Sequence, residues 1–324
     1  MADTSRTRTS ATQAGGAERP TILVTGADLA PQALDILREF DIAFAGETPD
    51  EDSLVDICTR TQPVGIIVRY GKISARIMDA SPKLCVISKH GSGTDTIDSK
   101  AASQRGIAVK AAVGSNADAV AEHTWALILA CAKGIVPLNS RMQEGYWDKV
   151  THRSLELKGR ALALVGLGLI GQRVAQIGNA FQMRVVAFDP YAKRIPAGVE
   201  LKDLDSVLAE ADVLSLHCPL TDQNRRMINS ETLARMRDGA ILVNTARGGL
   251  LDEQAIVDAV RSGKLRAAGL DSFAKEPLVG SHIFTGVPNV VLSPHVGGVT
   301  SDAYVNMGTA AARNVLDVLR EEAH

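Results

Sequence analysis

Short apolar runs alternate with longer amphipathic stretches along most of the 324 residues. In the first third, the expected strands are 22–24, 42–44, 66–68, 84–87 and 107–109. Further along, they are 161–165, 184–188, 212–216, 240–244, 266–270 and 290–293. Short buried strands that alternate with helices are typical of parallel sheets. The pattern therefore predicts an α/β fold with two Rossmann-like, doubly wound parallel-sheet domains, the first of them flavodoxin-like.

The remaining segments suggest where the domains begin and end. A long helix is expected over 116–133, with Ser115 or Asn116 as its cap. Residues 137–157 are polar and irregular, as in an excursion between domains. The amphipathic segment 302–319 has no strand of its own to cover, so we expect it to return to the first domain. The expected division is a discontinuous domain of 20–115 plus 299–324, a second domain of 116–298, and a flexible tail of 1–19.

Charge and cysteine content exclude several functional classes. Thirty-five Lys and Arg residues oppose 37 Asp and Glu residues, which argues against nucleic acid or an anionic membrane as a partner. No apolar run reaches the ~20 residues that span a bilayer. No two of the four cysteines lie within four positions of each other, so we expect no metal site. We expect the thiols to be reduced and the protein to be cytoplasmic. The amino-terminal residues lack the apolar core of a secretory signal, although a transit peptide stays open.

A glycine-rich turn follows the expected strand 161–165. Gly166, Gly168 and Gly171 form a GxGxxG pattern, and an amphipathic helix follows them. The first glycine would allow the tight turn, the second the close approach of a pyrophosphate, and the third the packing of helix on strand. Asp189, which ends the next expected strand, can accept hydrogen bonds from both ribose hydroxyls and repel a 2′-phosphate. The cofactor is therefore predicted to be NAD, with residual use of NADP left open by the neighbouring Lys193 and Arg194.

Three polar residues follow later strands of the same series, where parallel strands gather their carboxyl ends. Arg247, Glu276 and His295 each come shortly after a buried apolar run. Arg247 can bind a carboxylate in a bidentate pair, and His295 can exchange a proton with a carbonyl or alcohol oxygen. Glu276 can orient the imidazole and raise its pKa. Asp271 also ends a strand and is expected to bind the nicotinamide carboxamide. Taken singly, each of the three catalytic candidates has an ordinary alternative as an ion-pair partner or a loop residue.

Two loops of the first domain carry further candidates for substrate binding. The glycines of segment 89–95 can turn backbone N–H groups toward an anion. The segment 69–72 supplies Arg69 and Lys72, which either meet an acidic substrate or face water.

These motifs together resemble the D-isomer-specific 2-hydroxyacid dehydrogenase family, which includes D-3-phosphoglycerate dehydrogenases and glyoxylate/hydroxypyruvate reductases. The resemblance extends from about residue 20 to near the end of the chain. It rests on several motifs in the same order, namely 91–98, 116–123, 166–171, 217–220, 244–249, 270–277 and 293–298.

The resemblance implies roles that the residues alone do not give. It implies that the discontinuous domain binds substrate and that the nested domain, 116–298, binds NAD. It also implies an Arg247, Glu276 and His295 catalytic set, a substrate carboxylate on the backbone of Ser92 and Gly93, and a homodimer formed through the cofactor domain. Within the matching motifs it assigns cofactor contacts to Leu169, Ile170, Pro219 and Thr245, beside Gly166, Gly168, Gly171, Asp189 and Asp271. The sequence departs from the family at Lys89, where Arg is frequent, and at Tyr70, where Ser or Thr usually follows Arg69. Both changes touch the substrate-binding candidates.

The expected function is hydride transfer between NAD and C2 of a D-2-hydroxy or 2-oxo acid. 3-Phosphoglycerate is an alternative substrate to small acids such as glyoxylate and hydroxypyruvate, because Arg69, Lys72 and Lys89 can supply cations to a phosphate. An NAD(H)-responsive sensor or corepressor with the same fold is a rival of another class. A formate-type oxidation is a further rival, but it would not need a Glu-His pair.

Overall fold

A computed structural model describes residues 19–321 of the chain. The described chain forms two compact units, each treated below by itself. One holds the residues up to 90, 94–111 and those from 311 on, and the other holds 91–93 and 112–310. Nearly all of the predicted tail, 1–19, lies outside the described residues. The assignment of the units as substrate-binding and NAD-binding domains, with the boundaries given above, stays a prediction.

The first unit is built on a five-stranded parallel sheet in the order β2-β1-β3-β4-β5. This is the flavodoxin-like strand order. The short strands form because each is an apolar run, and β3 is buried along its whole length. The strands are β1 Thr21–Val24, β2 Asp41–Phe44, β3 Gly65–Val68, β4 Val86–Lys89 and β5 Ala108–Ala111.

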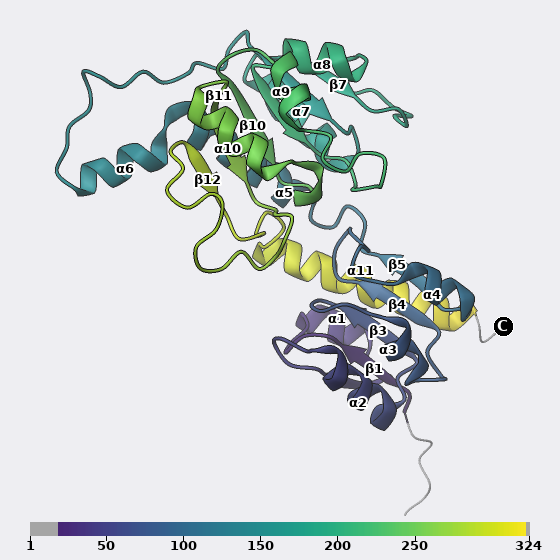
Figure 1. The fold of residues 1–324 in the computed structure, drawn as a ribbon. Coiled ribbons are helices and arrows are strands. Elements are labelled where there is room, and N and C mark those ends of the chain that lie inside the picture. The colour runs from purple at the N-terminus through teal and green to yellow at the C-terminus, as the bar shows by residue number, and fades with distance from the viewer. Residues whose placement is uncertain (1–18, 322–324) are drawn as a thin grey trace, which may run out of the picture. The chain divides into compact units, whose positions relative to one another are not determined.

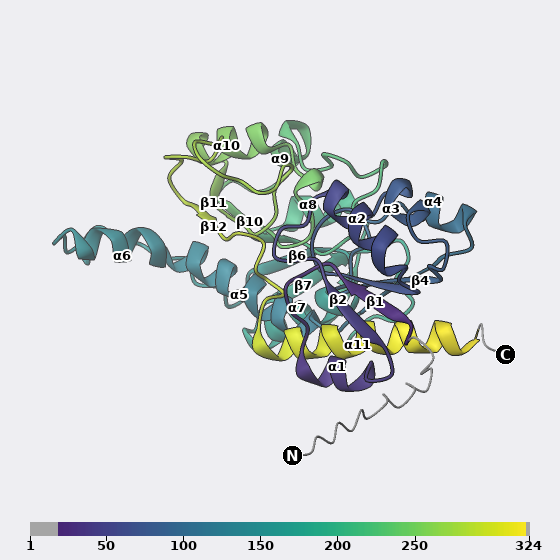
Figure 2. The same cartoon turned by 90° about the horizontal axis from the view of Figure 1, so that it is seen from below.

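Helices cover both faces of this sheet (Figures 1 and 2). One face packs against α2, α3 and α4 through a cluster of apolar side chains that includes Leu54, Ile77 and Ala102. The other face meets the end of α11, where Asn314 donates hydrogen bonds to Ser88 Oγ at 3.3 Å and to the Ala111 carbonyl at 3.1 Å. The helices are α1 Pro31–Ile36, α2 Glu51–Thr61, α3 Ala75–Asp79, α4 Ser99–Gln104 and α11 Ser301–Glu321.

Because α11 changes units at 310/311, its first half belongs to the second unit and its second half to the first. The predicted helix 302–319 is therefore present, and its second half packs in the first unit as expected.

The second unit contains a seven-stranded parallel sheet in the order β12-β11-β10-β9-β6-β7-β8. The first strand in sequence, β6, lies between β7 and β9, so the strand order reverses at β6, as in the doubly wound dinucleotide-binding fold. The strands are β6 Ala161–Val165, β7 Arg184–Phe188, β8 Val199–Leu201, β9 Val213–Leu216, β10 Ala240–Asn244, β11 Leu265–Leu270 and β12 Val290–Leu292.

Side chains alternate across β6 and so divide the core of this unit between two helical layers. Leu162 and Leu164 pack with α5 and α7, whereas Ala163 and Val165 pack with α8, α9 and α10. The elements are α5 Ala117–Lys133, α7 Leu169–Ala180, α8 Leu204–Glu210, α9 Ser230–Arg235, the 3₁₀ turn η1 Gly248–Leu250 and α10 Glu253–Ser262.

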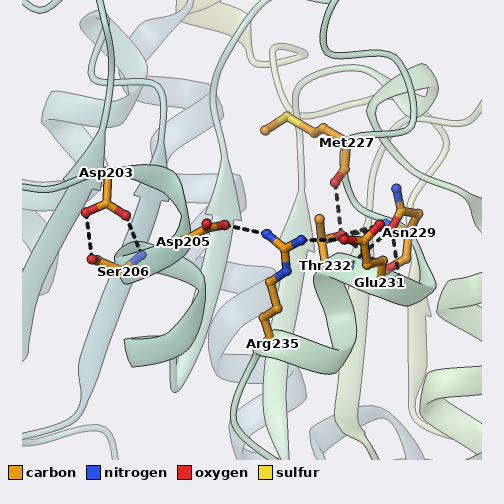
Figure 3. A network of polar contacts seen from close by, with 8 residues as sticks. All are labelled: Asp203, Asp205, Ser206, Met227, Asn229, Glu231, Thr232 and Arg235. Atoms are coloured by element: carbon orange, nitrogen blue, oxygen red, sulfur yellow. Dashed lines mark hydrogen bonds and ion pairs between the residues drawn. The ribbon is translucent and has the colours of Figure 1, made fainter.

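Polar contacts fix the beginnings of α8 and α9 (Figure 3). Asp203 caps α8 by accepting from the Ser206 N–H at 2.8 Å, and Asn229 forms a capping box with Thr232 at the start of α9. Arg235 of α9 reaches Asp205 of α8 at 2.6 Å and also pairs with Glu231. These contacts tie the two helices to each other on one face of the sheet.

Three local predictions were wrong. The segment predicted to be irregular begins inside a helix, α6 Ile135–Gln143, none of whose side chains is buried. Strand β8 was not predicted, because it has three residues at the edge of the sheet. Asn116 stands at the cap position of α5, but its side chain makes no capping bond and instead accepts from Ser92 Oγ at 3.2 Å.

The cysteines are free thiols, and two of the four are buried. Burial raises the pKa of Cys58 to about 11, of Cys131 to about 12 and of Cys218 to about 11. Among the described helices, none is by itself long and apolar enough to cross a membrane, and only the bent pair of α5 and α6 would meet that test together.

Candidate active site

The glycine-rich turn connects β6 to α7, as predicted. Gly166 has a φ of +99°, and a Cβ atom there would lie 2.6 Å from the backbone of His217. A Cβ at Gly171 would lie 2.2 Å from the Gly166 carbonyl oxygen. Both positions therefore exclude a side chain, which explains why the turn needs glycine there.

The middle glycine leaves space for a ligand. A Cβ at Gly168 would meet no atom within 4 Å. Gly168 is also the cap of α7 and offers no side-chain cap, so the first N–H groups of the helix are open to an anion. Leu169 is exposed and Ile170 half-buried at the same end. These features fit the pyrophosphate of a dinucleotide, which glycine turns of this kind hold by backbone N–H groups and the helix dipole.

Asp189 follows β7 and binds the turn. Its two carboxylate oxygens accept from the Leu167 N–H and the Tyr191 N–H, both at 2.8 Å. The carboxylate thus holds the backbone of the glycine turn and keeps lone pairs for further donors. A carboxylate beside the glycine turn fits the predicted contact with the ribose hydroxyls of a dinucleotide.

Two other predicted cofactor contacts lie after neighbouring strands. Pro219 is exposed in the loop after β9, and its carbonyl accepts from Asn224 at 2.8 Å. Thr245, directly after β10, is buried and shares a 2.8 Å hydrogen bond with the Thr124 hydroxyl of α5. In the same loop as Pro219, desolvation lowers the pKa of His217 to about 3, so its imidazole is neutral.

Glu276 and His295 are in direct contact. The imidazole Nδ1 of His295 lies 2.7 Å from Glu276 Oε2, and the other carboxylate oxygen accepts from the Phe273 N–H at 2.9 Å. His295 has a φ of +55°, and 47% of its side chain is exposed. Because Nδ1 faces the carboxylate, the second ring nitrogen is available to a ligand.

Arg247 begins a tight loop after β10. Asn244 holds this loop by donating to the Arg247 carbonyl at 2.9 Å and by accepting from the Ala246 N–H at 3.0 Å. The next residue, Gly248, packs so closely on Phe273 that a Cβ would lie 1.9 Å from its carbonyl carbon. This contact brings the Arg247 loop against the segment that leads to Glu276.

The charges of the three residues act on one another. The hydrogen bond that His295 donates to Glu276 raises the pKa of His295, although burial and the charge of Arg247 work in the opposite direction. Burial alone would raise the pKa of Glu276, but the hydrogen bonds from His295 and Phe273, together with the charges of His295 and Arg247, lower it overall. The contact therefore favours the charged forms of both His295 and Glu276.

Comparison with known proteins agrees with this arrangement. Residues 125–297 match the family model described as "D-isomer specific 2-hydroxyacid dehydrogenase, NAD binding domain". A hydroxypyruvate reductase of Thermotoga maritima is 37% identical over 88% of this chain and 93% of its own length. The chain belongs to the D-isomer-specific 2-hydroxyacid dehydrogenase family. As a member, it is an oxidoreductase of 2-hydroxy acids with a nicotinamide cofactor.

A longer relative and a solved structure are also similar to this chain. A D-3-phosphoglycerate dehydrogenase of Mycobacterium bovis is 38% identical over 91% of this chain, which spans only 56% of that protein. A crystal structure of a Thermus thermophilus protein superposes with a TM-score of 0.86 at 38% identity, covering 93% of this chain and 97% of the other. The family and the two-sheet α/β fold predicted from the sequence are thus confirmed.

The predicted substrate-binding residues of this dehydrogenase fall in both units. Ser92 and Gly93 lie in the second unit with the catalytic candidates, and Ser92 Oγ donates to the side chain of Asn116, just before α5. Arg69, Tyr70 and Lys89 lie in the first unit. There, Arg69 pairs with Asp28 and lies over the Tyr70 ring, while Lys89 Nζ donates to the Arg69 carbonyl at 3.1 Å.

Asp271, which is predicted to bind the nicotinamide carboxamide, is buried directly after β11. It is 1% exposed. Its carboxylate accepts from Ser293 Oγ at 2.6 Å, from the Val296 N–H at 2.9 Å and from the Gly297 N–H at 2.8 Å. His123 of α5, which the sequence interpretation placed in a matching motif without a role, lies beside Ser293. Its distance in sequence from Ser293 explains why no local pattern identified it.

Proposed function

We propose that this protein is an NAD-dependent dehydrogenase that transfers a hydride between the nicotinamide and C2 of a small D-2-hydroxy or 2-oxo acid. The observation that carries the proposal is the 2.7 Å contact between His295 Nδ1 and Glu276, next to the charge of Arg247. An imidazole can protonate a carbonyl oxygen near neutral pH when enough of it is in the protonated form, and the contact with Glu276 favours that form. A sensor that only binds NAD(H) has no need of this pair.

Each residue has a role that follows from its chemistry. Arg247 would bind the substrate carboxylate and polarise the adjacent carbonyl, because a guanidinium offers two parallel N–H donors. The second ring nitrogen of His295 would donate a proton to the carbonyl oxygen in reduction and accept it in oxidation. Glu276 would hold the ring and its charge. The bound nicotinamide supplies or accepts the hydride.

The dinucleotide would bind at the turn of Gly166, Gly168 and Gly171. Leu169 and Ile170 would lie beside the pyrophosphate, and Asp189 would bind the adenosine ribose and favour NAD over NADP. Pro219 and Thr245 would contact the nicotinamide half. Support for this placement is the open space at Gly168 and the uncapped start of α7.

Among substrates, we favour unphosphorylated acids such as glyoxylate or hydroxypyruvate, with the carboxylate on the backbone of Ser92 and Gly93. A phosphate would need extra cations. The Arg69 side chain is 12% exposed and already pairs with the Asp28 carboxylate, while it also donates to the Asp28 carbonyl at 2.7 Å. The negative charge of Asp28 beside Arg69 opposes the approach of a phosphate to this guanidinium.

The test is NADH oxidation with glyoxylate, hydroxypyruvate and phosphohydroxypyruvate, for the intact chain and for Asp28→Asn. We expect the highest kcat/KM with an unphosphorylated acid. The Asp28→Asn variant should gain relative activity with the phosphorylated acid, because Arg69 loses its partner. Selective turnover of phosphohydroxypyruvate by the unmodified chain would refute the substrate proposal. Absence of turnover with every acid would refute the dehydrogenase proposal and favour the sensor.

We further propose a homodimer in the cytoplasm. Helix α6 projects from the second unit in both views and buries none of its side chains (Figures 1 and 2). With the residues after it, it exposes an apolar surface made by Ile135, Val136, Met142, Tyr146, Trp147 and Val150. Large apolar side chains that are exposed together in one stretch of chain are often covered by a subunit interface. Free thiols at all four cysteines are in keeping with a reducing compartment.

Light scattering after size exclusion tests the dimer. The unmodified chain should have twice the chain mass of 34.3 kDa, and Trp147→Lys should shift it toward one chain mass. Tyr191→Lys, at an exposed aromatic side chain elsewhere in the same unit, serves as the control and should remain dimeric. A single chain mass for the unmodified protein at micromolar concentration would contradict the proposal.

A further inference from the structure

A second histidine lies behind the segment that carries His295. His123 of α5 places its Nε2 2.8 Å from Ser293 Oγ and 3.3 Å from Asp271 Oδ1. Only 23% of the His123 side chain and 2% of the Asp271 side chain are exposed. The three residues come from α5 and from the ends of β11 and β12, so the network joins three elements that are distant in sequence.

The hydrogen-bond donors in this network can be assigned. Ser293 donates its hydroxyl proton to Asp271 Oδ1 at 2.6 Å. The Ser293 oxygen is then an acceptor, so His123 must carry its proton on Nε2 and donate it to Ser293. His123 thereby holds the Ser293 hydroxyl in the orientation that Asp271 requires.

The network holds the backbone on both sides of His295. Ser293 precedes it, and Asp271 accepts from the N–H groups of Val296 and Gly297. His295 itself adopts a left-handed φ of +55°, which costs about 1 kcal/mol for a residue with a Cβ and persists only where the surroundings impose it. This backbone conformation of His295 is held by Asp271 directly and by His123 through Ser293.

We propose that His123 is a positioning residue for the reaction, acting through Ser293 and Asp271 to hold His295 against Glu276. The proposal rests on the catalytic role of His295 proposed above. His123 touches neither the reacting atoms nor Glu276 in this arrangement. Removal of the His123 imidazole should allow the backbone of 293–297 to move and should weaken the hydrogen bond between Glu276 and His295.

The experiment compares His123→Leu, His123→Gln and Ser293→Ala with the unmodified chain. His123→Gln retains an N–H donor and should restore most of the lost activity. The control is His282→Leu, which removes a part-buried imidazole that rests on Phe284, outside this network. The measurements are kcat and KM for 2-oxo acid reduction across pH, NADH affinity by fluorescence, and the titration of the His295 ring by NMR.

We expect kcat to fall roughly 10- to 100-fold in His123→Leu and Ser293→Ala, because an active group misplaced by about 1 Å can lose that much. NADH affinity should change less than twofold. The His295 ring should titrate at lower pH in both variants, and the alkaline limb of kcat should move with it. His282→Leu should keep the profile of the unmodified chain.

An unchanged His295 titration and kcat profile in His123→Leu and Ser293→Ala would overturn the inference. If His123→Leu does not fold, Ser293→Ala alone decides by the same measurements. The NMR titration needs no substrate. It therefore tests the inference even if every acid fails to react, an outcome that would refute the dehydrogenase proposal instead.

Discussion

Replacing Gly248 by alanine should separate the two loops that carry the catalytic candidates. Gly248 follows Arg247 directly and packs on the backbone of Phe273 and Ala274. A Cβ there would lie 1.9 Å from the Phe273 carbonyl carbon and 2.3 Å from the Ala274 nitrogen. Both neighbours are backbone atoms, so no side-chain rotation can relieve the contact.

The size of the effect follows from these distances. Carbon atoms reach favourable contact at about 3.5 Å, so the two backbones must separate by about 1.5 Å. The Phe273 N–H holds Glu276 at 2.9 Å, and Glu276 holds His295 at 2.7 Å, so the displacement is transmitted to the catalytic pair. We expect a loss of roughly 100-fold in kcat and of about 1–3 kcal/mol in the free energy of unfolding.

The assay is NADH oxidation with the best acid of the panel, together with thermal unfolding and NADH fluorescence. Gly249→Ala is the matched control, because a Cβ there meets the end of the Leu220 side chain, which can rotate away. It should keep kcat within a fewfold of the unmodified chain. If Gly248→Ala retained full kcat and stability, the argument that this glycine positions Arg247 relative to Glu276 would be wrong.

Three further predictions concern charge and cofactor. Glu276→Gln should lower kcat and shift the alkaline limb of a kcat–pH curve to lower pH, because the Glu276 hydrogen bond raises the pKa of His295 and reduction needs the protonated ring; an unmoved limb would contradict this. Gly168→Ala should fold normally, because its Cβ meets no protein atom, but should weaken NADH binding in a fluorescence titration. Gly171→Ala should lower the melting temperature, because its Cβ meets the Gly166 carbonyl oxygen. The reverse pattern would refute the cofactor placement. Asp189→Ala should reduce the preference for NADH over NADPH in kcat/KM, and a preference left intact would place discrimination elsewhere.

Sequence patterns predicted the strands well where burial makes them apolar. The expected β6, β7 and β10 agree with the structure at both ends, because each is buried along most of its length. The edge strand β8 is too short and too exposed to leave such a pattern. Helix α6 was missed although Ile135, Leu138 and Met142 follow a helical spacing and a proline in the first turn is compatible with a helix.

The candidate site was predictable as far as it depends on strand ends. Parallel strands bring the loops after β10, β11 and β12 to one edge, so Arg247, Glu276 and His295 could be grouped from their order alone. The burial of Asp271 could not be foreseen, because its partners come from two other elements. The same holds for the pairing of Arg69 with Asp28, which are separated by 41 positions.

The raised pKa values of Cys58, Cys131 and Cys218 have a consequence for how this protein withstands oxidation. Peroxides attack the thiolate rather than the thiol, and at neutral pH these three side chains remain protonated. Hydrogen peroxide at concentrations that inactivate thiolate enzymes should therefore leave them as thiols. Oxidation of these three thiols should therefore not limit the working lifetime of the enzyme.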